Sequence, residues 1–294
     1  MTPATPEQID LQAWVGKTET LHDLIDPRTA AALAATLDRP VAPATGTALP
    51  PLWHWTYFWS VAPQAQLGAD GHPERGGFLP PIALPRRMWA GGRLRFERSL
   101  TIGAAATRTS RILSVTGKSG KSGDLAFVTV QHEVGCNGAP CFTEEHDIVY
   151  RGMPPAGTVP PTPPPAPTDA VWKRLITPDP VLLFRYSALT FNGHRIHYDR
   201  SYATGVEGYP GLVVHGPLIA TLLVELLQQH LPQARLASFD FRAVSPLFDT
   251  EPFTVCGAPG ADGRTVRLWA ANARGGLAMQ AEATFDTTTP GVTA

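Results

Sequence analysis

The sequence predicts an α+β protein made of two related units, in which antiparallel strands wrap around one buried helix. Three observations support this. Residues 217–230 read as a helix that is apolar on nearly every side, each half of the chain ends in alternating strands, and a proline-rich segment divides the chain nearly in half. Both halves place helical or aromatic material early and strands late, which suggests a duplicated unit.

The boundary between the two units is marked by proline. Eight of the fourteen residues in 154–167 are proline. Such a segment favours an extended polyproline conformation and is not expected to join a sheet or a helix. We therefore expect an N-terminal unit over 1–153, a linker over 154–170 and a C-terminal unit over 171–294. A chain of 294 residues is long enough for two cores.

The first half opens with a helix. Asp26 and Pro27 read as its N-cap and first residue, and helix formers follow from Ala30 to Leu37. The aromatic segment 50–59 is expected in the core, because no basic side chains interleave with its rings as in a nucleic-acid platform. Strands are expected over 93–98, 110–115, 125–134 and 141–150, with a hairpin tip at 117–123.

The second half contains the buried helix. Val181–Tyr186 reads as a strand, and the helix follows from Pro217 to His230, with Gly216 as its N-cap. Glu225 is the exception in this apolar helix and is expected near a helix end or an interface. Four strands complete the chain, over 238–244, 253–257, 265–271 and 277–285.

Composition excludes several function classes. The 24 basic and 25 acidic side chains give a formal charge of −1, so no basic excess is available for nucleic acid or an anionic membrane. The longest apolar run, Leu218–Leu227, is too short to cross a bilayer. Met1–Glu7 has no export signal, and three cysteines cannot all pair with one another. We expect a cytoplasmic protein.

Polar residues crowd the chain just before the buried helix. The segment 192–199 reads Asn-Gly-His-Arg-Ile-His-Tyr-Asp, and 214–217 reads Val-His-Gly-Pro. A helix N-terminus presents free N–H groups and a positive dipole potential, which suit a carbonyl oxygen that gains negative charge. These two segments form the candidate site.

The same segments carry a family resemblance. They resemble the motif of the MaoC-like, R-specific enoyl-thioester hydratases, whose hot-dog fold wraps a sheet around one long helix. Segment 187–199 is similar to the branch with two hot-dog units per chain, the mesaconyl-C4-CoA (3-methylfumaryl-CoA) hydratases and 3-hydroxyacyl-thioester dehydratases. Segments 53–55 and 76–81 are similar to the N-terminal unit of that branch. The resemblance implies a double hot-dog with a reduced helix in the N-terminal unit.

The resemblance also assigns roles. His197 matches the catalytic histidine and Gly216 the glycine whose N–H binds the oxyanion. Asn192 falls where most members carry a catalytic aspartate, and a carboxamide cannot accept a proton. We therefore expect His197 to act nearly alone as general base, with the protons of water used for both steps. Supporting roles are expected for His194, Asp199 and His215.

The implied reaction is the reversible hydration of an enoyl-CoA thioester, above all of mesaconyl-C4-CoA to citramalyl-CoA. Dehydration of 3-hydroxyacyl thioesters in fatty acid metabolism stays open. The CoA phosphates need basic partners, for which we consider Arg86, Arg87, Arg195 and Arg242. No metal, flavin or nicotinamide cofactor is implied, since CoA is part of the substrate. Hot-dog sheets leave edges that often pair, which favours a homodimer.

Two hypotheses from other classes remain. His197, Asp199 and His215 spell a two-histidine, one-carboxylate iron site of oxygenases. The short spacing and the apolar helix after His215 argue against it. A non-catalytic acyl-CoA-binding protein is the other hypothesis, and the presence of both the base and the oxyanion donor argues against it.

Overall fold

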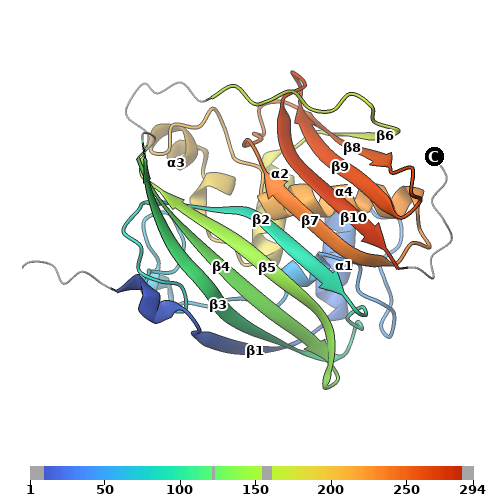
Figure 1. Cartoon of the computed structure of the whole chain (residues 1–294), viewed down its shortest axis with the longest axis horizontal. Coiled ribbons are helices and arrows are strands. Elements are labelled where there is room, and N and C mark those ends of the chain that lie inside the picture. Colours follow the sequence, from blue (N-terminus) through green and yellow to red (C-terminus); the bar gives the residue numbers. More distant parts are fainter. Residues whose placement is uncertain (1–9, 121–122, 154–160, 287–294) are drawn as a thin grey trace, which may run out of the picture.

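A computed structural model describes residues 10–120, 123–153 and 161–286, and its ten strands form one antiparallel sheet (Figure 1). The strand order is β1-β3-β4-β5-β2-β7-β10-β9-β8-β6. The strands are β1 (Thr18–Leu24), β2 (Arg86–Phe96), β3 (Ala105–Gly120), β4 (Gly123–Cys136), β5 (Ala139–Arg151), β6 (Trp172–Ile176), β7 (Leu236–Ala243), β8 (Phe253–Pro259), β9 (Thr265–Asn272) and β10 (Leu277–Phe285). The α-helices are α1 (Pro27–Thr36), α2 (Pro180–Leu189), α3 (Arg200–Gly205) and α4 (Gly216–His230).

The strand order repeats between the halves. In each half the strands lie in the order first, third, fourth, fifth, second, and the two second strands, β2 and β7, pair across the middle of the sheet. The register there places Leu94 opposite Phe239. The duplicated unit expected from the sequence is therefore present. The three-part division of the chain stays a prediction, since both halves share one sheet.

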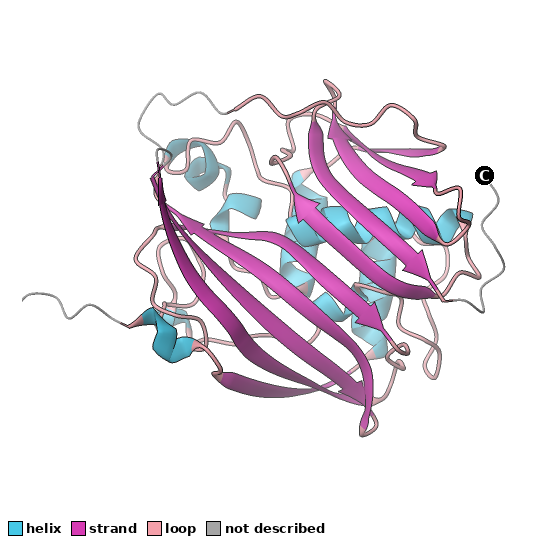
Figure 2. Cartoon of the chain, viewed as in Figure 1, coloured by secondary structure: helices cyan, strands magenta, loops and turns pink. Residues whose placement is uncertain are grey.

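Helix α4 forms the centre of the C-terminal half. Every residue from Leu218 to Leu227 is buried, and the helix packs against β6, β8, β9 and β10. Figure 2 shows the helices α1, α2 and α4 on the same side of the sheet. A helix that is apolar all round is buried all round, as predicted. Its N-terminal counterpart α1 has 10 residues against 15 in α4, which fits the expected reduction.

Two local predictions need correction. Val181–Tyr186 belongs to α2 and not to a strand, because the Asp179 side chain accepts from the Leu182 N–H and Pro180 occupies the first turn. The strand of this region is β6, which the sequence pattern did not indicate, and β1 was missed likewise. Helix α4 begins at Gly216 with His215 as its N-cap, one residue before the prediction.

The proline-rich linker lies along the C-terminal unit in its described part, while 154–160 fall outside the described residues. The Ala166 N–H donates to the Gly275 carbonyl (2.9 Å), and the Leu277 N–H donates to the Pro164 carbonyl (2.7 Å). The prediction that this segment does not join a sheet was wrong where these two hydrogen bonds form, because a proline lacks the N–H donor but keeps its carbonyl acceptor.

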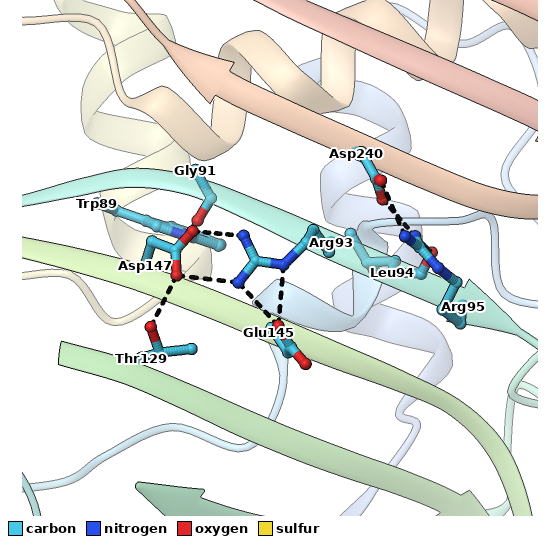
Figure 3. Close-up of polar contacts among 9 residues, drawn as sticks. All are labelled: Trp89, Gly91, Arg93, Leu94, Arg95, Thr129, Glu145, Asp147 and Asp240. Atoms are coloured by element: carbon cyan, nitrogen blue, oxygen red, sulfur yellow. Dashed lines mark hydrogen bonds and ion pairs between the residues drawn. The ribbon is translucent and has the colours of Figure 1, made fainter. Parts of the chain in front are cut away.

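Charged side chains cross the junction of the two halves on the sheet surface (Figure 3). Arg93 of β2 pairs with Glu145 and Asp147 of β5, and Arg95 pairs with Asp240 of β7. These side chains are a third to a half exposed, so each pair contributes little to stability.

Glu225 makes the buried contact between the halves. Its carboxylate accepts from Arg39 Nε (2.6 Å) and from Trp53 Nε1 (3.0 Å), both from the N-terminal half. The carboxylate is nearly fully buried and fully paired. The interface position expected for Glu225 is confirmed. No helix of the described residues is long and apolar enough to cross a bilayer.

Candidate active site

His197 lies in a short 3-10 turn, Arg195–His197, that follows α2. Its Nδ1 lies 2.7 Å from the Val213 carbonyl oxygen. A carbonyl only accepts, so Nδ1 carries the proton and Nε2 keeps a free lone pair. Burial lowers the pKa of His197 to about 4, so the ring is neutral at pH 7. A neutral imidazole with its lone pair fixed in place is suited to act as a general base.

The ring of His215 packs against the ring of His197. The His197 and His215 rings stack with their centroids 3.7 Å apart and their planes at 17°. His215 Nε2 shares a hydrogen bond of 2.8 Å with the hydroxyl of Ser187 on α2. Burial holds the pKa of His215 far below its usual value. His215 therefore fixes the orientation of His197 and joins it to the start of α4.

The N–H of Gly216 is the first of α4. Within the described chain it has no hydrogen-bond acceptor, as is usual for the first turn of a helix. The backbone carbonyl of Trp89 lies 4.0 Å from the position that a Gly216 Cβ would take. Because Trp89 belongs to β2, with a bulge between Trp89 and Gly91, the N-terminus of α4 meets the N-terminal half here. This donor can hold an oxygen anion.

Asn192 and Asp199 shape the loop that carries His197. Asn192 Oδ1 accepts from the His194 N–H (3.0 Å), so the amide fixes the turn before the 3-10 segment. Asp199 caps α3 by accepting from the Tyr202 N–H (3.1 Å) and pairs with Arg195 (2.7 Å).

The metal site considered on His197, Asp199 and His215 gains no geometric support. Among the described residues, His197, Asp199 and His215 do not form a group of possible metal ligands.

The four candidate arginines differ in how they are engaged. Arg86 is buried, pairs with Glu207 (2.9 Å) and lies over a tyrosine ring. Arg195 holds Asp199 and the Ala69 carbonyl. Arg242 is exposed on β7.

Arg87 of β2 is half-buried and interacts with the Tyr150 hydroxyl. Its positive charge helps to lower the pKa of both His72 and His194. In the described part of the chain no carboxylate lies within ion-pairing distance of Arg87. Of the four candidate arginines, Arg87 is the one that has no carboxylate partner in the described chain and whose charge acts on His72 and His194.

Sequence reasoning missed two polar residues of the N-terminal half, Asp70 and His72. The His72 ring lies 4.1 Å from the His194 ring between centroids, and the Asp70 carbonyl accepts from the Arg195 N–H (2.9 Å). Their signal in the sequence is Asp-Gly-His, a polar turn, but more than 120 residues separate it from His194 and Arg195.

The backbones meet at two glycines. Gly71 has φ +87°, and a Cβ on it would stand 2.0 Å from the Gly193 carbonyl oxygen. A Cβ on Gly193 would stand 2.6 Å from the Gly71 carbonyl oxygen. Both positions need glycine, and the contact locks the loop of Asp70 and His72 onto the loop of His197.

Comparison with known proteins identifies the family of the chain. The family model of hydroxyacyl-thioester dehydratase type 2 matches residues 52–249. A mesaconyl-C4-CoA hydratase of Chloroflexus aurantiacus is 54% identical over 257 residues, covering 86% of this chain and 90% of that protein. The mitochondrial hydroxyacyl-thioester dehydratase type 2 of Schizosaccharomyces pombe is 29% identical over 235 residues, covering 71% of this chain and 78% of that protein.

Solved structures confirm the double hot-dog fold. A MaoC-like dehydratase from Phytophthora capsici superposes with a TM-score of 0.67 at 16% identity, covering 94% of this chain and 97% of the other. A Mycobacterium tuberculosis protein described as having a double hotdog fold gives 0.56 at 14% identity, covering 92% and 96%. The chain belongs to the hydroxyacyl-thioester dehydratase type 2 family and has a double hot-dog fold.

Proposed function

We propose that the protein catalyses the reversible hydration of mesaconyl-C4-CoA to citramalyl-CoA, as a hydro-lyase that acts on CoA thioesters. The observation that carries the proposal is a neutral, oriented imidazole next to an unpaired helix N-terminal N–H, in a chain 54% identical to a mesaconyl-C4-CoA hydratase. Both groups belong to segments that match the motif of the family.

In the proposed mechanism, Gly216 N–H binds the thioester oxygen and makes the β-carbon electrophilic. His197 Nε2 takes a proton from water as the oxygen of that water bonds to the β-carbon. The π electrons move onto the thioester oxygen as an enolate, which returns to the carbonyl when the α-carbon takes a proton. His215 holds the plane of the His197 ring during these steps.

The substrate of this reaction carries a carboxylate and a methyl group on the β-carbon. A carboxylate at that position needs a cation close to the base. We assign this role to Arg87, whose charge acts on His72 and His194 and which has no carboxylate partner in the described chain. Arg86 and Arg195 already hold carboxylates of the chain, and their roles toward the CoA phosphates, like that of Arg242, stay predictions.

A second candidate is the dehydration of 3-hydroxyacyl thioesters of fatty acid metabolism. The fission yeast relative, a hydroxyacyl-thioester dehydratase, favours it. The two candidates use the same base and the same oxyanion donor and differ in what surrounds the β-carbon. A straight-chain substrate places no charge near Arg87, whereas the dicarboxylic substrate does.

The test is the loss of enoyl-thioester absorbance with mesaconyl-C4-CoA, with crotonyl-CoA measured beside it. We expect rapid loss with mesaconyl-C4-CoA and at least tenfold slower loss with crotonyl-CoA. The reverse preference would assign the protein to fatty-acyl dehydration. Inactivity with both would contradict the proposal.

The proposal also covers the cofactor requirement, the oligomeric state and the location of the protein. Water supplies both added groups, so the reaction itself requires no redox cofactor. The edge strands β1 and β6 leave backbone groups that a second copy can pair with, and a homodimer remains our expectation. A cytoplasmic location also stays a prediction.

A further inference from the structure

The proposed reaction has two proton transfers, which a second group can share with His197. Water loses one proton at the β-carbon side, and the α-carbon gains one. The family motif supplies an aspartate for this purpose, but here Asn192 occupies the position and its amide oxygen accepts from the His194 N–H. The carboxamide of Asn192 cannot give up or take up a proton near neutral pH.

A carboxylate and an imidazole from the N-terminal half stand at the same site. Asp70 Oδ2 lies 3.1 Å from His72 Nδ1, and Asp70 Oδ1 accepts from the His72 N–H (3.0 Å). These contacts hold the pKa of Asp70 well below its usual range despite burial, so the carboxylate is ionised. His72 Nδ1 therefore donates to Asp70, which leaves His72 Nε2 free to exchange a proton.

Within the described cluster of four histidines, only His72 touches a carboxylate. His197 donates to a carbonyl, His215 shares its proton with Ser187, and His194 has no hydrogen bond from its ring. Asp70 is thus the group that favours a proton on His72, while burial and Arg87 lower the pKa of His72 below its usual value. The pKa of His194 is lowered to about 2 by burial and by the neighbouring histidines, so His194 stays neutral.

The geometry connects the two ends of the cluster. The His194 ring lies between His72, at 4.1 Å between centroids, and His197, at 5.5 Å. His72 is also close enough to His197 for its charge to lower the pKa of His197. A substrate that reaches both His72 and His197 can meet a base at its β-carbon and an acid at its α-carbon.

We propose that the Asp70–His72 pair is the second proton-transfer group of the site, with His72 as a catalytic residue and Asp70 as its positioning residue. In hydration, His197 takes a proton from water while the C–O bond forms, and His72 in its imidazolium form gives its Nε2 proton to the α-carbon of the enolate. The proton on His197 then returns to His72 past His194. No oxidant or reductant is needed, and the inference rests on the proposed function.

The charges that face His72 are Asp70, Arg87, Arg75, His194 and His197. Burial and the two arginines lower the pKa of His72 below its usual value, and Asp70 opposes this shift by stabilising the imidazolium form. A substrate carboxylate bound at Arg87 compensates part of that positive charge. Binding of a dicarboxylic substrate therefore favours the protonated His72 that the reaction uses.

The decisive experiment separates the two proton transfers. Citramalyl-CoA is incubated in D₂O, and exchange of the α-hydrogen is measured beside dehydration. We expect His197→Ala to retain α-hydrogen exchange while dehydration falls at least a hundredfold, and His72→Gln to lose both by about a hundredfold. Exposed His22 on β1 gives the matched control, and His22→Gln should behave as wild type.

Asp70→Asn tests the pair without removing the imidazole. Loss of the carboxylate makes the imidazolium of His72 less stable, so the alkaline limb of the hydration rate should move to lower pH with KM little changed. Asp70→Glu should restore part of it. A purely structural role of Asp70 would lower the rate equally at every pH, and that result would overturn the proposal.

Other outcomes are equally decisive. Wild-type rates in folded His72→Gln would overturn this inference alone, whereas an inactive wild type would overturn the proposed function as well. The ligand atoms of Asp70, His72 and His194 lie within 4.8 Å of one another, a spacing that also suits a metal ion. Activity that is lost on chelation and restored by Zn²⁺ would overturn the proton-transfer role.

Discussion

His197 and His215 stack ring on ring at 3.7 Å, one held by the Val213 carbonyl and the other by the Ser187 hydroxyl. The contact joins the loop that carries the base to the first residues of α4, where the Gly216 N–H lies. The base and the oxyanion donor are therefore parts of one rigid assembly, and neither can shift without the other.

His197→Ala should lower turnover at least a hundredfold, because the variant removes the general base and leaves the oxyanion donor in place. Circular dichroism and thermal unfolding check that the fold is retained. Normal turnover in a folded variant would rule out the assignment of His197.

The hydration rate should persist into acidic solution. Burial lowers the pKa of His197 to about 4 from 6.5, so the base remains neutral at pH 5. We expect the acid limb of kcat/KM near pH 4, measured with the free thioester in buffers of constant ionic strength. An acid limb near pH 6.5 would show that the ring is solvated in the active enzyme.

The same pKa has a consequence for stability. The folded pKa lies below the unfolded value, so the contribution to stability is complete above pH 6.5 and is lost as the pH falls toward 4. For His197 this amounts to about 3 kcal/mol, at roughly 1.4 kcal/mol per pKa unit. Urea unfolding at pH 7 and pH 5 should show about 2 kcal/mol of this loss, and His197→Gln should reduce the difference between the two pH values.

Asn192→Asp should keep or raise activity. The carboxylate can accept from the His194 N–H as the amide oxygen does, and it adds a group that can hold a proton. Initial rates with mesaconyl-C4-CoA test this prediction. An inactive but folded variant would mean that the amide itself is required.

Arg87→Met should change substrate preference more than it changes the chemistry. Removal of the cation should raise KM for mesaconyl-C4-CoA at least tenfold and leave crotonyl-CoA nearly unaffected, since only the first carries a β-carboxylate. Arg242→Met, on the exposed face of β7, is the matched control. Equal losses with both substrates would exclude a carboxylate-binding role.

Glu225→Gln should destabilise the fold by about 2–4 kcal/mol, because Arg39 and Trp53 lose the carboxylate that accepts from both. Asp240→Asn removes an exposed pair on the sheet surface and should cost well under 1 kcal/mol. The two unfolding curves in urea compare a buried with an exposed pair in one protein. Equal losses would contradict the role given to Glu225.

The sequence predicts the parts of this fold whose pattern is local. The all-round apolar character of α4 and the alternation along β7 to β10 each follow from side-chain periodicity, and their observed bounds agree within two residues. The strand predicted for Val181–Tyr186 was wrong, because its apolar run fits either a strand or a buried helix. The Asp179 cap, which settles the choice, was overlooked.

The site was only half accessible to sequence reasoning. His197, His215 and Gly216 lie within twenty residues of one another and share a motif, whereas Asp70 and His72 reach them through a contact between distant loops. The sequence around Gly71 and Gly193 does not predict that their backbones touch. The contact depends on how two distant loops pack, which no periodicity encodes.

Because β2 and β7 pair within one chain, a substitution alters one half of the sheet and leaves the other half unchanged. In a symmetric pair of identical subunits, every change of residue appears twice and must suit both positions. Here the two copies lie in one polypeptide, so each half can vary alone. The C-terminal half keeps the long helix and the base, while the N-terminal half, with its shorter helix, contributes the Asp70–His72 loop to its neighbour. Two halves with the same strand order thus contribute different groups to one site.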